Sequence, residues 1–277
     1  MKNFLQNKLL VCDLDGTLLD KNGEIDQESL ILIKTFCKDG GNFVVCTGRM
    51  DTDIQYVERK LGFQSSYRIS QNGAVIRDKN NQILSFEKIP RQYVAQLNEI
   101  IFGMNLRTEV NNLTNRLFPS PRAPGSVAEF VDSSIIIKNL ADFVLNKEKN
   151  PTIYLTFGNK EQFTIIRQKI YNILGKNAVK VVETSPTSLE VFSTKASKGT
   201  ATGLIMEQLR LSADNVYVAG DAESDIAMFA YAKHSFAVEQ ADSFVREQAD
   251  AYVSSVGEIV KIIYKEHSNV NSTLRST

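Results

Sequence analysis

Short unbroken apolar runs alternate with amphipathic segments along the first third of the chain. Leu9–Cys12 and Phe43–Cys46 are continuous apolar runs, which are typical of strands buried on both faces of a parallel sheet. Between them, apolar residues recur at helical spacing in a segment that Asp26 can cap and Gly40 can stop. A second amphipathic segment follows the second run and ends at Gly62. This order of strand, helix, strand and helix predicts a doubly wound α/β sheet.

The middle of the chain, from about residue 83 to 190, has a less regular order of elements. Pro90 can begin a helix there, and a cluster of prolines around Pro119 to Pro124 marks a loop. The segments 152–157 and 178–182 have the composition of strands, and an apolar-striped helix lies between them. We interpret this part as an inserted α+β domain.

The last third returns to the earlier alternation. The pattern predicts, in order, a helix, three strands, a closing helix and a frayed tail, over residues 198–211, 216–219, 235–238, 251–253, 259–264 and 269–277. We therefore expect an α/β protein with a Rossmann-like, doubly wound parallel-sheet core of residues 1–82 and 191–277. Residues 83–190 form the inserted α+β domain in this interpretation.

Composition narrows the classes of function. Apolar residues make up 43% and charged residues 23% of the chain, and the 32 basic side chains balance the 32 acidic ones, which argues against a nucleic-acid partner. The chain has no apolar stretch of membrane length, so we expect no membrane partner. The 3 cysteines do not form a disulfide framework, which favours the cytoplasm. The chain has only 2 histidines, so a serine-histidine catalytic triad or a zinc centre with several histidine ligands is not expected.

Three predicted strands each end in a polar cluster. The clusters are Asp13–Thr17, Thr47–Arg49 and Gly220–Asp225. Ligands of open parallel sheets bind beyond the carboxyl ends of the strands, so the three clusters should meet at one crevice. Acidic side chains gathered there would repel one another, and Mg²⁺ with its oxygen ligands would relieve the repulsion. Lys198 and the hydroxyl of Thr47 could then hold phosphoryl oxygens.

These motifs resemble those of a known enzyme family. Asp13-Leu14-Asp15-Gly16-Thr17, Thr47-Gly48-Arg49, Lys198-Gly199 and Gly220-Asp221 to Ser224-Asp225 are similar, in this order, to the four motifs of the haloacid dehalogenase superfamily. The insertion, with Gln71-Asn72-Gly73-Ala74 shortly before it, resembles the large α+β cap of the Cof-type subgroup. The resemblance covers nearly the whole chain and implies a phosphatase that acts on a small phosphorylated metabolite, with sugar phosphates as the favoured class.

The resemblance also implies the roles of the site residues. Asp13 would be the nucleophile that forms an aspartyl-phosphate, and Asp15 the acid and base. Thr47, Gly48, Lys198 and Ser224 would bind the phosphoryl group, while Mg²⁺ would be held by Asp13, the backbone carbonyl of Asp15, Asp221 and Asp225. Ser224 departs from the asparagine that is usual in the subgroup, and its shorter side chain has less reach. We expect reduced or retuned activity at most.

Each of these residues also has a plainer interpretation. Thr47 could cap the helix that follows it, Asp221 and Asp225 could cap a helix, and Arg49 could be structural or lie near phosphate. The default for Cys12, Cys46 and His234 is packing. The aromatic residues of the insertion, Tyr154, Phe157 and Phe163, are expected in its core rather than in a pocket.

Two other functions stay open at this point. A phosphomutase or phosphotransferase would use the same core residues and pass the phosphoryl group from Asp13 to a second alcohol. A regulator that only binds a phosphorylated metabolite is disfavoured, because it has no use for an acid/base carboxylate beside a nucleophile. The sequence does not identify the substrate or the oligomeric state.

Overall fold

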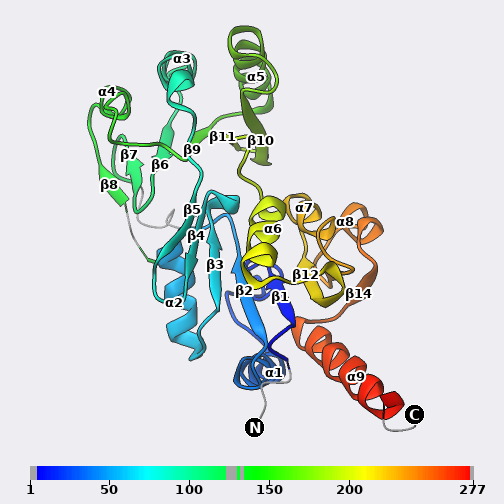
Figure 1. Ribbon diagram of the computed structural model, residues 1–277. Coiled ribbons are helices and arrows are strands. Elements are labelled where there is room, and N and C mark those ends of the chain that lie inside the picture. Colours follow the sequence, from blue (N-terminus) through cyan, green and yellow to red (C-terminus); the bar gives the residue numbers. More distant parts are fainter. Residues whose placement is uncertain (1–4, 123–129, 132–133, 275–277) are drawn as a thin grey trace.

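The protein contains two β-sheets, each covered by helices (Figure 1). The computed structural model describes residues 5–122, 130–131 and 134–274. The expected proline loop lies partly outside the described residues, since Pro124 is not among them. Within the described part, no helix has an apolar stretch of the length that a bilayer crossing needs.

The larger sheet has eight strands in the order β14-β13-β12-β1-β2-β3-β4-β5. The strands from β14 to β3 are parallel, and β4 and β5 add antiparallel pairs at one edge. Their bounds are β1 (Leu9–Cys12), β2 (Asn42–Cys46), β3 (Tyr67–Ser70), β4 (Val75–Asp78), β5 (Ile83–Phe86), β12 (Val216–Gly220), β13 (His234–Val238) and β14 (Ala251–Val253). From β1 the strands follow in the order β2 and β3 toward one edge, and from β12 they follow in the order β13 and β14 toward the other edge. The strand order therefore reverses between β1 and β12, and ligands of such sheets bind at this point.

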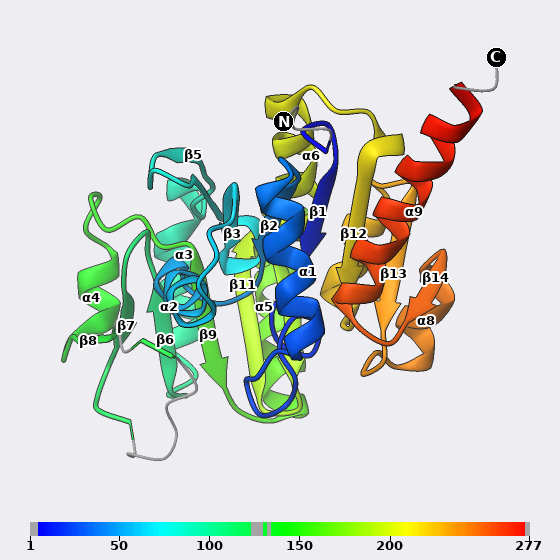
Figure 2. The same ribbon diagram turned by 90° about the horizontal axis from the view of Figure 1, so that it is seen from below.

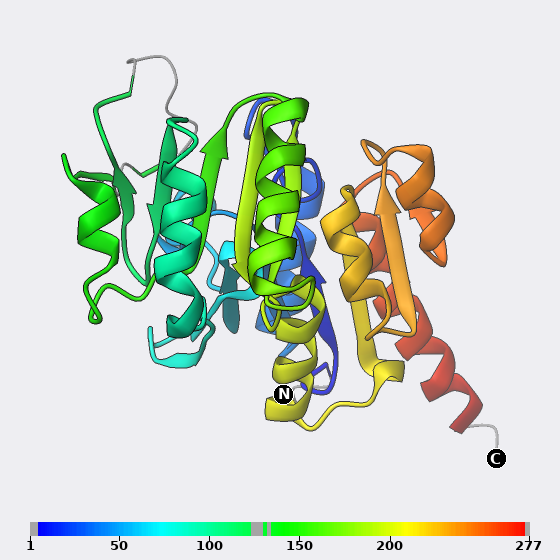
Figure 3. The same cartoon turned by 90° about the horizontal axis from the view of Figure 1, so that it is seen from above.

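Helices cover both faces of this sheet (Figures 2 and 3). One face carries α1 (Gln27–Lys38), α2 (Asp51–Leu61) and α9 (Val256–Leu274); the other carries α6 (Lys198–Leu209), α7 (Ile226–Phe229) and α8 (Ser243–Gln248). Neighbouring residues of one strand point to opposite faces, so Leu10 packs in the first core and Val11 in the second. This two-sided burial explains why the strands are unbroken apolar runs.

The smaller sheet has six strands in the order β10-β11-β9-β6-β7-β8. Their bounds are β6 (Thr108–Asn111), β7 (Arg116–Phe118), β8 (Ser134–Ile136), β9 (Ile153–Phe157), β10 (Val179–Ser185) and β11 (Ser188–Ser193). Its helices, α3 (Arg91–Phe102), α4 (Leu140–Val144) and α5 (Lys160–Leu174), cover the face turned away from the larger sheet (Figure 1). Among the described residues, no helix covers the opposite face, which looks toward the carboxyl ends of β1 and β2.

Three single turns of 3₁₀ helix complete the secondary structure of the described residues. They are η1 (Gln71–Gly73), η2 (Ala213–Asn215) and η3 (Glu223–Asp225). Two of them matter for the site. η1 joins β3 to β4, and η3 follows β12 directly.

The expected fold class is confirmed. The Asp26 side chain accepts a hydrogen bond from the Ser29 N–H at 2.8 Å and caps α1, as predicted, and left-handed Gly62 ends α2. The expected frayed tail is wrong over residues 269–274, because α9 continues to Leu274. A helix propagates easily from turns that are already packed, as those of α9 are at Ile259.

The chain passes from one sheet to the other a few residues after each of the expected domain boundaries. Ile83–Phe86 pairs with β4 in the larger sheet, and β11 extends to Ser193 in the smaller one. The changes of sheet therefore fall after Phe86 and after Ser193, rather than at 82/83 and 190/191. The assignment of the two sheets to separate domains stays a prediction.

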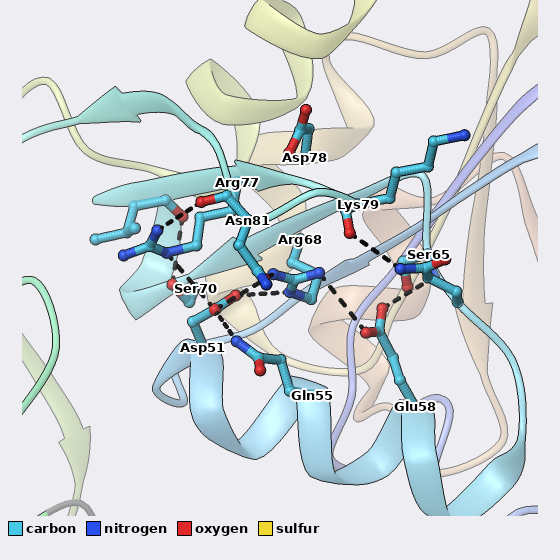
Figure 4. Close-up of polar contacts among 12 residues, drawn as sticks. Asp51, Gln55, Glu58, Ser65, Arg68, Ser70, Arg77, Asp78, Lys79 and Asn81 are labelled. Atoms are coloured by element: carbon cyan, nitrogen blue, oxygen red, sulfur yellow. Dashed lines mark hydrogen bonds and ion pairs between the residues drawn. The ribbon is translucent and has the colours of Figure 1, made fainter.

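A buried arginine on β3 holds α2 against the larger sheet (Figure 4). Arg68 on β3 is 2% exposed, and its Nε donates to Asp51 Oδ1 at 2.8 Å. Its guanidinium also lies 3.7 Å from Glu58 and donates to the side chain of Asn81, in the turn between β4 and β5. These contacts fix the start of α2, just after the loop that carries Thr47.

Candidate active site

The three strand-end clusters meet at one edge of the larger sheet. β1 pairs with β2 on one side and with β12 on the other, all in parallel. Asp13 follows β1 and continues its ladder, since its N–H donates to the carbonyl of Ala219 at 3.0 Å. Thr47 follows β2, and Asp221 follows β12. The expected convergence on one crevice agrees with this placement.

Lys198 lies between two buried carboxylates. Its Nζ donates to Asp13 Oδ1 and to Asp225 Oδ1, each at 2.6 Å. Ser197 and Thr200 form a capping box that begins α6 at Lys198 and so aims the side chain inward from the first turn. Burial on its own lowers the pKa of Lys198, but the two carboxylates outweigh it and raise the pKa well above its usual range. Lys198 is therefore a fixed positive charge.

A third carboxylate, that of Asp221, completes an acidic cluster. Asp13, Asp221 and Asp225 each offer an oxygen, and these oxygens lie within 4.8 Å of one another. Burial raises the pKa of Asp221, and the nearby Asp225 adds to the rise while the Thr17 hydroxyl opposes it. Three carboxylates surround one lysine, so the cluster favours a cation, and its oxygen ligands suit Mg²⁺.

Two neighbours shape the cluster. The Thr17 hydroxyl donates to Asp221 Oδ1 at 2.8 Å. Gly16 has a φ of +83°, and a Cβ at this position would lie 2.4 Å from Asp221 Oδ2. Only glycine permits both this backbone conformation and this approach of Asp221.

Asp225 differs from the other two acids because both of its oxygens have partners. Oδ1 accepts from Lys198, and Oδ2 accepts the backbone N–H groups of Asp221 and Ala222 at 3.1 and 3.0 Å. Asp225 is fully buried. It holds Lys198 and the η3 loop in place, which agrees with a supporting role better than with direct metal ligation. The plainer interpretation of a capping acid is correct in this respect.

Asp15 lies apart from the acidic cluster. It lines the same cavity as Asp13, but its side chain is half exposed and forms a two-pronged ion pair with Arg49, at 2.6 and 2.8 Å. The guanidinium of Arg49 also lies 4.1 Å above the ring of Phe130. Arg49, for which the sequence allows a structural role or a place near phosphate, is thus the direct partner of Asp15.

Thr47 and Gly48 line the cavity beside Asp13. Thr47 is 2% exposed, and its hydroxyl oxygen accepts the N–H of Arg49 at 3.2 Å. It does not cap α2, which begins at Asp51 after Met50. Ser224 lies exposed in η3 and lines the same cavity. The expected phosphate-binding residues are therefore together.

The cavity has a volume of about 890 Å³ and lies between the two sheets. Its wall opposite the acidic cluster comes from alternate residues of the smaller sheet, namely Leu155, Phe157, Lys180, Val182, Ser188, Glu190 and Phe192. Tyr154 and Phe163 lie in the helix-side core, as expected. Phe157 was also expected there, but it lines the cavity instead, because it lies on the helix-free face of β9. Sequence reasoning missed Glu190 and Lys180. The one available signal was their alternation with apolar residues along a strand.

The remaining candidates are packing residues. Cys12 and Cys46 are fully buried, in agreement with the default interpretation. The ring of His234 stacks on Tyr217 with the ring centres 4.4 Å apart, at the other end of β12 and β13 from the acidic cluster.

Comparisons with known proteins agree with this geometry. The family model of the haloacid dehalogenase-like hydrolases matches residues 10–263. The phosphatase YwpJ of Bacillus subtilis is 26% identical over 285 residues, which cover 94% of this chain and 96% of YwpJ. A second Bacillus subtilis protein, the 5-amino-6-(5-phospho-D-ribitylamino)uracil phosphatase YcsE, is 26% identical over 243 residues, 86% of each chain.

A solved structure has the same fold. The TM0651 protein of Thermotoga maritima superposes with a TM-score of 0.80 and 25% identity, over 92% of this chain and 96% of its own. The family match spans nearly the whole chain and includes all four motifs. The chain therefore belongs to the haloacid dehalogenase-like hydrolases, and it is a phosphatase that acts on a phosphorylated substrate.

Proposed function

We propose that the chain is a magnesium-dependent phosphatase that hydrolyses a small phosphorylated metabolite, with Asp13 carrying the phosphoryl group between two steps. The observation that carries the proposal is the contact of Lys198 with Asp13 and Asp225, next to Asp221, at the floor of the cavity. It combines a buried nucleophile with a fixed cation. An aspartyl-phosphate mechanism needs both.

The acidic cluster is suited to hold Mg²⁺. Asp13 and Asp221 would be its side-chain ligands and Asp15 would add its backbone carbonyl, with Asp225 in support. The ion would offset the negative charge that the attacking carboxylate and the phosphoryl group share. The excess of three carboxylates over one lysine supports this assignment.

In the first step a carboxylate oxygen of Asp13 bonds to phosphorus as the ester P–O bond breaks. Lys198, Thr47 and the backbone of Gly48 hold the phosphoryl oxygens, and the Ser224 hydroxyl faces the same space. The leaving oxygen takes its proton from Asp15. Asp15 must leave Arg49 for this transfer, because their ion pair occupies both of its oxygens.

In the second step a water oxygen bonds to phosphorus, and the bond between phosphorus and Asp13 breaks. Asp15 accepts the proton of that water and is ready to act as the acid again. Free phosphate leaves, and the Asp13 carboxylate is restored. Once its pair with Asp15 opens, Arg49 can donate to an anionic substrate from the cavity wall.

Sugar phosphates and related polyol phosphates are the substrates that we favour. The substrate in the name of YcsE carries a phosphorylated ribityl chain. The volume of the cavity, about 890 Å³, suits a small metabolite. We also propose a reducing compartment, the cytoplasm, because Cys12, Cys37 and Cys46 are all free thiols.

Phosphate release from a panel of sugar phosphates and p-nitrophenyl phosphate, with Mg²⁺, tests the proposal. Asp13→Asn and EDTA should each abolish turnover, and added Mg²⁺ should reverse the effect of EDTA. Asp142→Asn, an exposed acid on α4, is the matched control and should retain wild-type rates. Full activity of Asp13→Asn would refute the mechanism. An isomeric sugar phosphate in place of free phosphate would identify a phosphomutase.

A further inference from the structure

The turn between β3 and β4 has an unusual backbone. Gln71, Asn72 and Gly73 have φ angles of 53°, 55° and 93°, three left-handed residues in a row. A Cβ on Gly73 would lie 2.2 Å from the carbonyl oxygen of Ser197, just before Lys198. Such backbone persists only where its surroundings hold it, and it is common at functional sites.

Asn72 in this turn contacts both walls of the cavity. Its N–H donates to the carbonyl of Thr47 at 3.0 Å, on the phosphate side. Its side-chain Nδ2 donates to Glu190 Oε2 at 3.1 Å, on the smaller sheet. Asn72 thus links the Glu190 carboxyl group on one wall to the Thr47 loop on the other. It thereby sets the position of Glu190 relative to the residues that would hold the phosphoryl group.

Glu190 occupies the middle of that wall. It lies on β11, directly across from Leu155 on β9 and from Val182 on β10, and all three line the cavity. Phe192 flanks it on the same face. Glu190 is therefore a carboxyl group with apolar neighbours on the two adjacent strands, in a wall that also carries Lys180 and Ser188, on the side where the leaving group of a substrate must lie.

One oxygen of this carboxyl is available to a ligand. Within the described part of the chain, Asn72 is the one hydrogen-bond donor to Glu190, and it uses Oε2 alone. A purely structural buried carboxyl usually has partners for both oxygens, as Asp225 does. Burial raises the pKa of Glu190 to about 7, against the influence of Arg116, the Asn72 bond and Lys198. Near neutral pH the group can therefore accept or donate a hydrogen bond.

We propose that Glu190 determines substrate specificity by hydrogen-bonding a hydroxyl group of the leaving alcohol, and that Asn72 is the residue that positions it. The preferred leaving groups are then polyhydroxylated, such as sugars and sugar alcohols. This inference rests on the proposed phosphatase function. It goes further by naming the residue that distinguishes such esters from esters without hydroxyl groups.

The test compares substrates with and without hydroxyl groups. For the wild type and Glu190→Gln, kcat/KM is measured on hexose 6-phosphates and ribose 5-phosphate, and each value is divided by kcat/KM on p-nitrophenyl phosphate. Glutamine keeps the shape but replaces a charge-capable acceptor with a neutral one, so the ratio should fall roughly tenfold. Asn72→Ala removes the hydrogen bond that positions Glu190 but keeps its carboxyl group, so it should lower the same ratio by less than Glu190→Gln does.

The controls separate this inference from the proposed function. Glu161→Gln, an exposed glutamate on α5, should keep the wild-type ratio, and thermal unfolding should show that all variants are folded. An unchanged ratio in folded Glu190→Gln would overturn the inference and leave the phosphatase function intact. So would a wild type that cleaves p-nitrophenyl phosphate but no hydroxylated ester. A wild type that releases no phosphate at all would overturn both.

Discussion

At the scale of single residues, the acids of the site divide into different tasks. Asp13 lines the cavity and Asp221 lies half-buried beside it, whereas Asp225 is fully buried with both oxygens bonded. Loss of the Asp225 carboxylate should lower the catalytic rate, because Lys198 and the η3 loop would no longer be held in place. Loss of the Asp221 carboxylate should instead lower the affinity for the metal ion.

This division gives a prediction for Asp225→Asn and Asp221→Asn. Asparagine at position 225 places an N–H group or a neutral oxygen against the Lys198 ammonium, and the lost charged hydrogen bond should cost about 2 kcal/mol, or roughly 30-fold in kcat/KM. The Mg²⁺ concentration for half-maximal activity should change little. Asp221→Asn should instead raise that concentration strongly. If both variants respond alike to a Mg²⁺ titration, the two acids do not have separate tasks.

Glu190 gives a prediction about stability and pH. Its pKa of about 7 in the folded protein exceeds the ordinary 4.5 because of burial. Between these values the folded chain keeps a proton that the unfolded chain releases, so the free energy of unfolding falls as pH rises. Glu190→Gln lacks this proton, and its unfolding temperature should rise relative to wild type from about pH 4.5 to about pH 7 and then level off. Thermal unfolding of both proteins across this pH range measures the difference in unfolding temperature. A difference that does not change with pH would contradict the raised pKa of Glu190.

At the scale of elements, α2 depends on one buried cation. Arg68 on β3 bonds Asp51 and lies near Glu58, both on α2 (Figure 4). Burial raises the pKa of Glu58, and the bonds from Ser65 and the charge of Arg68 oppose the rise. The contact with Arg68 therefore fixes the first residue of the helix, Asp51. The loop that carries Thr47 leads directly into this residue, so its end is fixed as well.

Arg68→Met should be strongly destabilising. It fills a similar volume but takes the nearby positive charge from Glu58 and leaves Asp51 with Arg77 as its remaining ion-pair partner. The loss of a partner from a buried ion pair costs about 3–5 kcal/mol. The free energy of unfolding in urea measures the effect. Arg59→Met, at an exposed position of the same helix, is the control and should cost well under 1 kcal/mol. Equal effects of the two substitutions would show that the buried ion pairs contribute nothing.

Elements also show what the sequence could and could not predict. The buried strands and the helices around Asp26 and Gly62 follow from local patterns, and so do the strand-end positions of Asp13, Thr47 and Asp221. The pairing of Asp15 with Arg49 and of Asn72 with Glu190 could not be predicted, because these partners are 34 and 118 residues apart. The first contact depends on which side chains of two neighbouring strand-end loops meet, and the second on how the smaller sheet lies over the larger one. No local pattern encodes either. The length of α9 was missed for a related reason, since packing rather than residue preference sustains it.

At the scale of the whole molecule, the site exists only where the two sheets face each other. The strand ends of the larger sheet supply the acids, the first turn of α6 supplies Lys198, and the smaller sheet supplies the wall with Glu190. The clustered acids lie within 4.8 Å of one another and repel, so a bound cation should stabilise the entire fold.

Metal binding should therefore be visible as a thermal shift. With Mg²⁺ at about 100 times its Kd, the folded state should gain about 2.7 kcal/mol. EDTA should remove the gain, and Asp221→Asn should not show it. Asp214→Asn, an exposed acid outside the cluster, is the control and should respond as the wild type does. An equal shift in Asp221→Asn and wild type would mean that Mg²⁺ binds elsewhere.

The most direct measurement of the central claim is the mass of the peptide that contains Asp13 after acid quench during turnover. The wild type with Mg²⁺ and a hydrolysed sugar phosphate should show a fraction of this peptide heavier by one phosphoryl group, and tandem fragmentation should place that group on Asp13. The adduct should be absent from Asp13→Asn and from EDTA-treated enzyme. A phosphoryl group on another residue, or active turnover by Asp13→Asn, would contradict the account.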